Sequence, residues 1–197
     1  MKSSFILALL CTTLAHAAVA IDLSPRFMVT DGDGIKIRRP YFADGDRKFA
    51  ITIDRETELL DYEGSALFNF RGYARAAMRL RPSPLEATLP FDALNVARYR
   101  EAALAMLIQG AEKAVIENEL TNVLPINEWQ SLRFIVTYEL TGSKMRETIT
   151  FLNLEAQKQI VFQIRAKESD FAVVAARGED IMRRWHEVLP GSEVAGN

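Results

Sequence analysis

The chain has 197 residues, with 24 Lys and Arg against 26 Asp and Glu, one cysteine and two histidines. A net charge of −2 is not the basic balance that a nucleic-acid-binding protein normally carries. With one cysteine and two histidines, the chain also lacks the usual zinc ligand sets and has no pair of cysteines for an internal disulfide.

The first twenty residues predict a secretory signal peptide. Lys2 gives a short cationic start, residues 5–14 form an apolar run too short to span a bilayer, and residues 15–17 offer small side chains around a cleavable bond. We expect cleavage after Ala17 or Ala20. The mature protein is then predicted to be periplasmic or secreted.

Cleavage of the signal peptide would leave the mature chain with fewer side chains capable of catalysis. It removes Cys11, which excludes catalysis by a thiol, and it leaves His186 as the single imidazole. A lipid on Cys11 is the disfavoured alternative, because Leu10 stands where a lipoprotein signal peptidase needs a small residue. Residues 21–197 suffice for one domain with a sizeable core, and they contain no apolar run long enough to cross a membrane.

The first half of the mature chain predicts short strands joined by tight turns. Asp-Gly turns precede residues 35–38 and 49–53, where apolar side chains alternate as in a half-buried hairpin. Weaker strand patterns follow at residues 59–62, 66–70 and 73–81. Pro82, Pro84 and Pro90 then predict a loop.

An amphipathic helix is predicted from Asp92 to Gln109. Asp92 can cap its first N–H groups, and Gly110 is a natural residue just beyond its end. The predicted apolar stripe consists of Val96, Ala103, Leu104, Leu107 and Ile108, with Arg100 as one basic interruption.

The second half predicts a strand at residues 114–121 and an antiparallel meander at 132–140, 145–154 and 159–167, since the connections are short. A final helix begins near Ser169, where Ser169 or Asp170 can cap it, and runs toward Trp185. Gly178 inside this helix indicates a close packing contact or, alternatively, a break into two shorter helices. The predicted fold class is α+β, an antiparallel sheet packed against helices.

This order of elements resembles the PsbP-like family of α/β/α sandwiches, which includes bacterial periplasmic DcrB-like proteins. The resemblance covers roughly residues 35–187 and rests on residues 129–138, 159–164 and 171–185, which are core patterns. It implies the fold and a tendency toward non-enzymatic binding or assembly roles. It transfers no site residue, and the additional residues 59–90 depart from the simplest form of the fold.

The remaining candidates for metal or catalytic chemistry have simpler explanations. The loops that begin at Asp31 and Asp44 lack the glycine and the last carboxylate of an EF-hand, so they predict turns and leave only a nonstandard calcium site. His186, near the end of a helix, fits a capping or surface role. No phosphate-binding glycine loop or nucleophile elbow is present, and no cofactor or metal is predicted.

Two groups of charged residues could still carry function. The strand acids Glu117, Glu119, Glu128, Glu139 and Glu147 allow a carboxylate-dependent hydrolase if two of them lie close together. Arg75, Arg79 and Arg81 alternate along one predicted strand face. Arg71, and with it Lys36, Arg38 and Arg39, would extend this basic face if their strands are neighbours. This basic face is the predicted partner-binding surface, and an ordinary solvated face is its structural alternative.

The sequence thus predicts an exported, non-catalytic binding or assembly module of the cell envelope. Its partner would be an unknown envelope protein or an anionic surface, and no nucleic acid. The two alternatives are a carboxylate-dependent hydrolase and a carrier of a small apolar ligand between helix and sheet. Partner, pathway and oligomeric state stay open.

Overall fold

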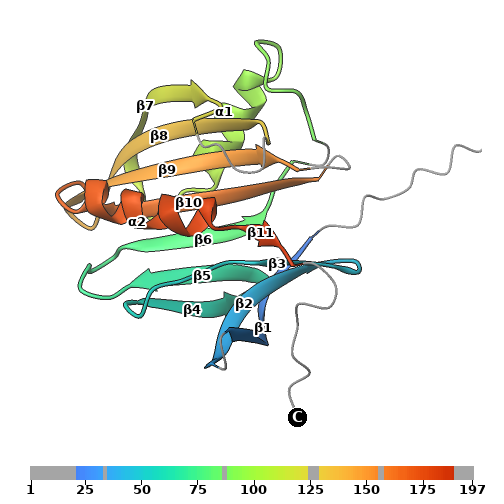
Figure 1. The fold of residues 1–197 in the computed structure, drawn as a ribbon. Helices are drawn as coiled ribbons and strands as arrows, with labels where there is room; N and C mark the ends of the chain where they lie inside the picture. Colours follow the sequence, from blue (N-terminus) through green and yellow to red (C-terminus); the bar gives the residue numbers. More distant parts are fainter. Residues whose placement is uncertain (1–20, 33–34, 86–87, 124–128, 155–157, 189–197) are drawn as a thin grey trace, which may run out of the picture.

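The computed structural model describes residues 21–32, 35–85, 88–123, 129–154 and 158–188, so the predicted signal peptide lies outside it. Its elements are β1 (Asp22–Gly32), β2 (Ile35–Asp44), β3 (Arg47–Ala50), β4 (Thr57–Tyr62), β5 (Ser65–Phe70), β6 (Ala77–Pro82), α1 (Val96–Ala105), β7 (Glu112–Thr121), β8 (Ser131–Leu140), β9 (Ser143–Asn153), β10 (Gln159–Lys167), α2 (Phe171–Arg183) and β11 (His186–Glu187). The strands form two antiparallel sheets (Figure 1). Neither helix in the described ranges is long and apolar enough to cross a membrane.

The larger sheet has the strand order β4-β5-β6-β10-β9-β8-β7. The predicted meander is confirmed as β8, β9 and β10, with Ile149 of β9 opposite Phe134 on one side and Gln163 on the other. β10 also pairs with β6, so the strands before α1 continue the same sheet. Among the described strands, β4 and β7 form its two edges, and the pairing of β7 with β8 slips in register twice.

The two helices cover opposite faces of the larger sheet. Ile164 of β10 lies in one core cluster with Val174 of α2. Val161, an odd number of residues away on the same strand, lies in a second cluster with Tyr99 of α1. In Figure 1, α2 crosses the front of the sheet and α1 lies behind it. The predicted α+β class, a sheet between helices, is confirmed.

The smaller sheet, β1-β2-β3-β11, closes the core on the α2 side. Its β2-β3 hairpin confirms the prediction and places Phe42 opposite Phe49. Trp185 stacks on Phe42, with ring centroids 5.3 Å apart, and its own side chain is 2% exposed. Immediately after Trp185, β11 pairs with β3. The end of α2 is therefore tied to the small sheet by both a buried ring and a strand.

The predicted boundaries of α1 were too wide. The Asp92 carboxylate accepts hydrogen bonds from the N–H groups of Leu94 and Asn95, each at 3.0 Å, and so stabilises a turn ahead of the helix. The predicted stripe was also partly wrong, because Leu104 is 38% exposed. Tyr99 is fully buried instead, and its hydroxyl donates to the Leu89 carbonyl at 2.7 Å.

α2 is one continuous helix, and Gly178 has the packing role that was preferred. A Cβ atom at Gly178 would lie 2.7 Å from Cδ1 of Ile164, closer than real Cβ contacts come. Asp170 occupies the N-cap position, but its side chain makes no capping hydrogen bond. The glycine therefore lets the helix lie close to β10.

Candidate functional site

A cavity of about 500 Å³ lies on the α1 face of the larger sheet. Side chains of β5, β6, β9 and β10 form its floor, and residues 105–109, at the end of α1, form the opposite wall. Small-molecule sites typically have volumes of about 300–1,000 Å³. Because Arg79, Arg81 and Arg165 all line this space, we refer to it as the arginine cavity.

Arg79 is held in the cavity by the β4-β5 hairpin. Its Nε and Nη2 atoms donate hydrogen bonds to Ser65 Oγ at 3.2 and 3.0 Å, and its guanidinium carbon lies 4.8 Å from the centre of the Tyr62 ring. Glu63 approaches Nη2 at 3.6 Å, but the Glu63 side chain is 73% exposed. Such an exposed pair neutralises little of the arginine's charge.

Arg81 lies two residues further along β6, so its side chain leaves the same face of the strand. No described side chain forms a hydrogen bond or ion pair with it. Partial burial lowers the pKa of Arg81 and the positive charge of Arg79 lowers it further, while the charge of the exposed Glu63 offsets only part of this. Both effects disfavour the charged form, which an arginine nevertheless keeps at any physiological pH. A bound anion would offset both.

Arg165 brings a third guanidinium from β10. It pairs in register with Ala77 of β6 on one side and with Glu147 of β9 on the other. It is therefore a diagonal neighbour of Arg79, at the distance of about 7–8 Å typical of such positions. The floor of the cavity thus carries three cations from two adjacent strands.

Glu147 is the buried acid of this site, with 2% of its surface exposed. One carboxylate oxygen accepts a hydrogen bond from the Tyr138 hydroxyl and the other from Gln163 Nε2, each at 2.9 Å. Burial raises the pKa of Glu147, while these two contacts and the charge of Arg165 act in the opposite direction. Gln163 Nε2 also donates to the Met106 carbonyl at 3.1 Å, which links the acid to the end of α1.

Arg75 does not share the face of Arg79 and Arg81. β6 begins at Ala77, and Arg75 precedes it with a left-handed φ of 67°. Its Nη1 atom donates to the Leu140 carbonyl at 3.0 Å and to Ser143 Oγ at 3.3 Å, both at the β8-β9 turn. The prediction of three alternating arginines on one strand was therefore wrong for Arg75. Only Arg79 and Arg81 lie on β6, and Arg75 contacts the β8-β9 turn.

The other basic residues considered in the sequence do not join this cluster. Lys36, Arg38 and Arg39 lie on β2 of the smaller sheet. Arg71 is an exposed residue at the turn after β5 and does not line the cavity.

The strand acids considered in the sequence do not gather at one place either. Glu117, Glu119 and Glu139 form ion pairs with Arg146, Arg100 and Lys113, each at 2.9 Å, and Glu128 lies outside the described residues. Glu147 is the one carboxylate among the described residues that line the cavity. A glycosidase-type mechanism needs two, about 5 to 9.5 Å apart. The described cavity gives the hydrolase hypothesis no such pair.

His186 and the loop acids supply no alternative centre. His186 is an exposed residue of β11, and no three or more His, Cys, Asp or Glu side chains in the described ranges are placed to hold a metal ion. Asp33, part of the first loop considered for calcium, lies outside those ranges.

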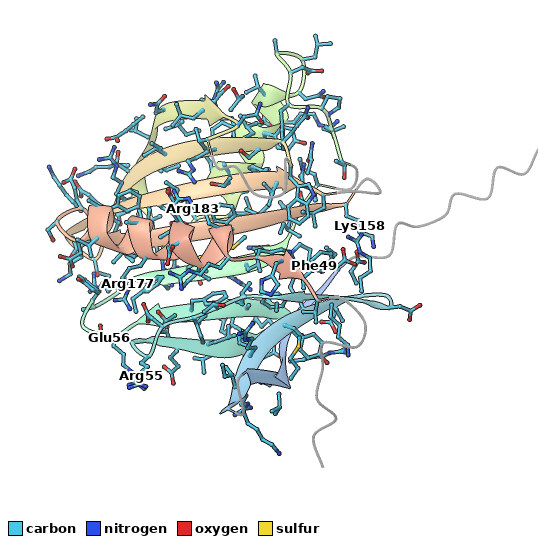
Figure 2. The ribbon with its side chains drawn as sticks, viewed as in Figure 1. Phe49, Arg55, Glu56, Lys158, Arg177 and Arg183 are labelled. Atoms are coloured by element: carbon cyan, nitrogen blue, oxygen red, sulfur yellow. The ribbon has the colours of Figure 1, made fainter. Side chains whose placement is uncertain are left out.

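A second depression, of about 610 Å³, lies along the outer face of α2 beside residues 52–54. Its charged side chains already bind one another. Arg177 Nη2 lies 3.0 Å from both carboxylate oxygens of Asp54, and Arg184 pairs with Asp180 at 2.6 Å. Figure 2 shows Arg177 and Glu56 on this side of the molecule. This depression is less suited to a charged ligand than the arginine cavity, where Arg81 is unpaired.

The sequence singled out Arg79 and Arg81 but not the other residues that line the arginine cavity. Arg165 and Gln163 belong to a strand that was assigned to the core, and residues 105–109 were assigned to a longer helix. Glu147 was considered as a strand acid without a partner. One signal was available, since polar residues at 163 and 165 interrupt the otherwise apolar strand from Ile160 to Ala166.

No family model matches the chain, and no curated protein matches it. Among solved structures, a protein of unknown function and putative regulator from Pseudomonas aeruginosa aligns at 12% identity and a TM-score of 0.43, covering 84% of this chain and 97% of that one. LpqN from Mycobacterium tuberculosis, which is involved in cell envelope biogenesis, aligns at 11% identity with a TM-score of 0.47. This alignment covers 75% of this chain and 87% of LpqN. PsbP (CyanoP) from Synechocystis sp. PCC 6803 aligns at 12% identity with a TM-score of 0.48. This alignment covers 71% of this chain and 86% of PsbP.

Proposed function

We propose that this protein is an exported, non-catalytic binding module of the cell envelope that holds a small anionic molecule in the arginine cavity. The observation that carries the proposal is the partial burial of Arg81 together with its lack of a close ion-pair partner. Its half-buried guanidinium lies beside Arg79 and forms no ion pair or hydrogen bond with a described side chain, and the acid whose charge acts on it is the largely exposed Glu63. Arginine binds carboxylate and phosphate groups through parallel N–H donors, so these anions are the chemistry that the site suits.

The architecture supports binding of a small molecule at this site more than binding of a broad partner surface. Residues 105–109 stand over the arginines and confine them to a cavity of about 500 Å³. A macromolecular partner would need these cations on an open face. Export is supported by the cationic, apolar and small-residue pattern of residues 1–20.

Methyl phosphate tests the proposal, because it offers the anion without a large attached group. Titrated into the mature protein at low salt and followed by amide NMR, it should give saturable shifts at β6, β10 and residues 105–109. The double variant Arg79→Gln, Arg81→Gln should lose these shifts and keep its circular dichroism spectrum.

A charge-matched control is provided by Arg55→Gln, Arg71→Gln. Both residues are exposed and lie outside the cavity, and Arg55 points away from the body of the protein in Figure 2. This control should bind methyl phosphate as the parent protein does. Equal binding by the cavity variant, or equal loss in both variants, would refute the proposed site.

A further inference from the structure

The arginine cavity is lined by two kinds of surface. Arg79, Arg81 and Arg165 make one part of the lining cationic. Another part is largely apolar and consists of Tyr62, Leu67, Met106, Leu107 and Ile108. Leu67 lies directly opposite Arg79 in the β5-β6 register. The change from cation to hydrocarbon therefore takes place across one pair of neighbouring strands, about 4.8 Å apart.

The apolar surface continues beyond the cavity on the same face of the sheet. Leu60 of β4 is opposite Leu67, and side chains at directly opposed positions share a face. Leu60 is 39% exposed and Tyr62 46% exposed. The core cluster of α1 contains residues of β8, β9 and β10, so this helix leaves the β4-β5 part of the face uncovered.

We infer that the ligand is a single-chain anionic amphiphile whose head lies at Arg79 and Arg81 and whose hydrocarbon chain lies over Leu67 and Leu60; this inference rests on the proposed function. The charge complementarity fixes the end at which the head binds. From Arg79 to Leu60 is two strand spacings, about 10 Å, so a chain of moderate length covers the strip. Residues 105–109 cover the arginines, so the cavity is better suited to a single dissolved amphiphile than to the surface of a membrane.

Decyl phosphate, used below its micelle concentration, is the probe, and methyl phosphate is its headgroup counterpart. Burial of two methylene groups alone corresponds to about a tenfold gain in affinity. Decyl phosphate should therefore bind the mature protein at least about tenfold more tightly than methyl phosphate by calorimetry. Arg79→Gln, Arg81→Gln should weaken both ligands.

Leu60→Asn separates the chain contact from the head contact. It should reduce the affinity for decyl phosphate several-fold and leave methyl phosphate unchanged. Leu94→Asn is the matched control, because Leu94 is 89% exposed and does not line the cavity, and it should leave both affinities unchanged.

Three results would overturn the inference. Equal affinities for methyl and decyl phosphate would leave an anion site without a chain site, so the proposed function would stand alone. Failure of both ligands to bind would remove the proposed function as well. Sedimentation with phosphatidylglycerol vesicles in the absence of monomeric decyl phosphate binding would replace the amphiphile by a membrane surface.

Discussion

Arg165 lies directly opposite Glu147 in the pairing of β10 with β9, and its charge counteracts part of the effect of burial on that acid. The pKa of Glu147 nevertheless remains raised, because the carboxylate is almost completely removed from water. The buried acid of the site therefore titrates above the usual range of a glutamate.

This relationship predicts a pH-dependent stability that Glu147→Gln should alter. Because the pKa is raised in the folded state, folding favours the protonated acid. That contribution is full below the ordinary pKa of about 4.3 and is lost as the pH rises through the raised value. The amide stays neutral, so the melting temperature of Glu147→Gln minus that of the parent should increase from pH 4 to pH 8. A constant difference across this range would contradict the prediction.

Gly178→Ala should destabilise the protein by about 1–3 kcal/mol, as overpacking in a filled core does. The reason is the 2.7 Å approach of a new Cβ to Ile164 Cδ1. Ile164→Val removes that methyl group, so the double variant should lose less stability than the sum of the two single variants in urea unfolding. Strict additivity would mean that α2 moves away without meeting Ile164.

Trp185→Ala should cost about 3–5 kcal/mol of unfolding free energy, the range for truncating a buried Trp or Phe. Trp185 stacks on Phe42 and lies next to β11, so its loss opens the contact between α2 and the small sheet. Thermal unfolding measures the change, with Val173→Ala, at a 51% exposed position of α2, as a control expected to change little. A shift of one or two degrees for Trp185→Ala would show that the ring contributes little packing energy.

Export predicts a defined N-terminus. Mass spectrometry of the periplasmic or secreted protein should find a chain that starts at Ala18 or Ile21, because the pattern of residues 1–20 fits a general signal peptidase. Replacing the apolar Leu9 and Leu10 by Arg should retain the precursor in the cytoplasm. An intact Met1 on the exported protein, or a lipid on Cys11, is the result that contradicts this prediction.

Local pattern predicted much of the fold. The alternation of Met78 and Leu80 with Arg79 and Arg81 gave the two faces of β6 correctly, since side chains of a strand alternate. The extension of that pattern to Arg75 was wrong because a turn with left-handed backbone stands before the strand. β1 was missed, and its register shift between Asp22 and Arg26 shows that its alternation is irregular.

The cavity itself was beyond local reasoning. It exists because β6, from before α1, pairs with β10, from after it, and this contact is not encoded by either segment alone. The same pairing brings Arg165 toward Arg79. The early end of α1 at Ala105 then turns residues 105–109 over the arginines, which periodicity had continued as helix.

β7 gives the protein one further property. In the part of the chain that the structure describes, it is an edge of the larger sheet, and its side chains are mostly exposed. Its two slips in register and the positive φ of 54° at Lys113 prevent it from being a straight edge, while Glu117 and Glu119 place charge along it. A second copy would therefore meet a kinked, charged row of donors and acceptors, which is a poor template for strand addition and protects this end of the sheet from edge-to-edge aggregation.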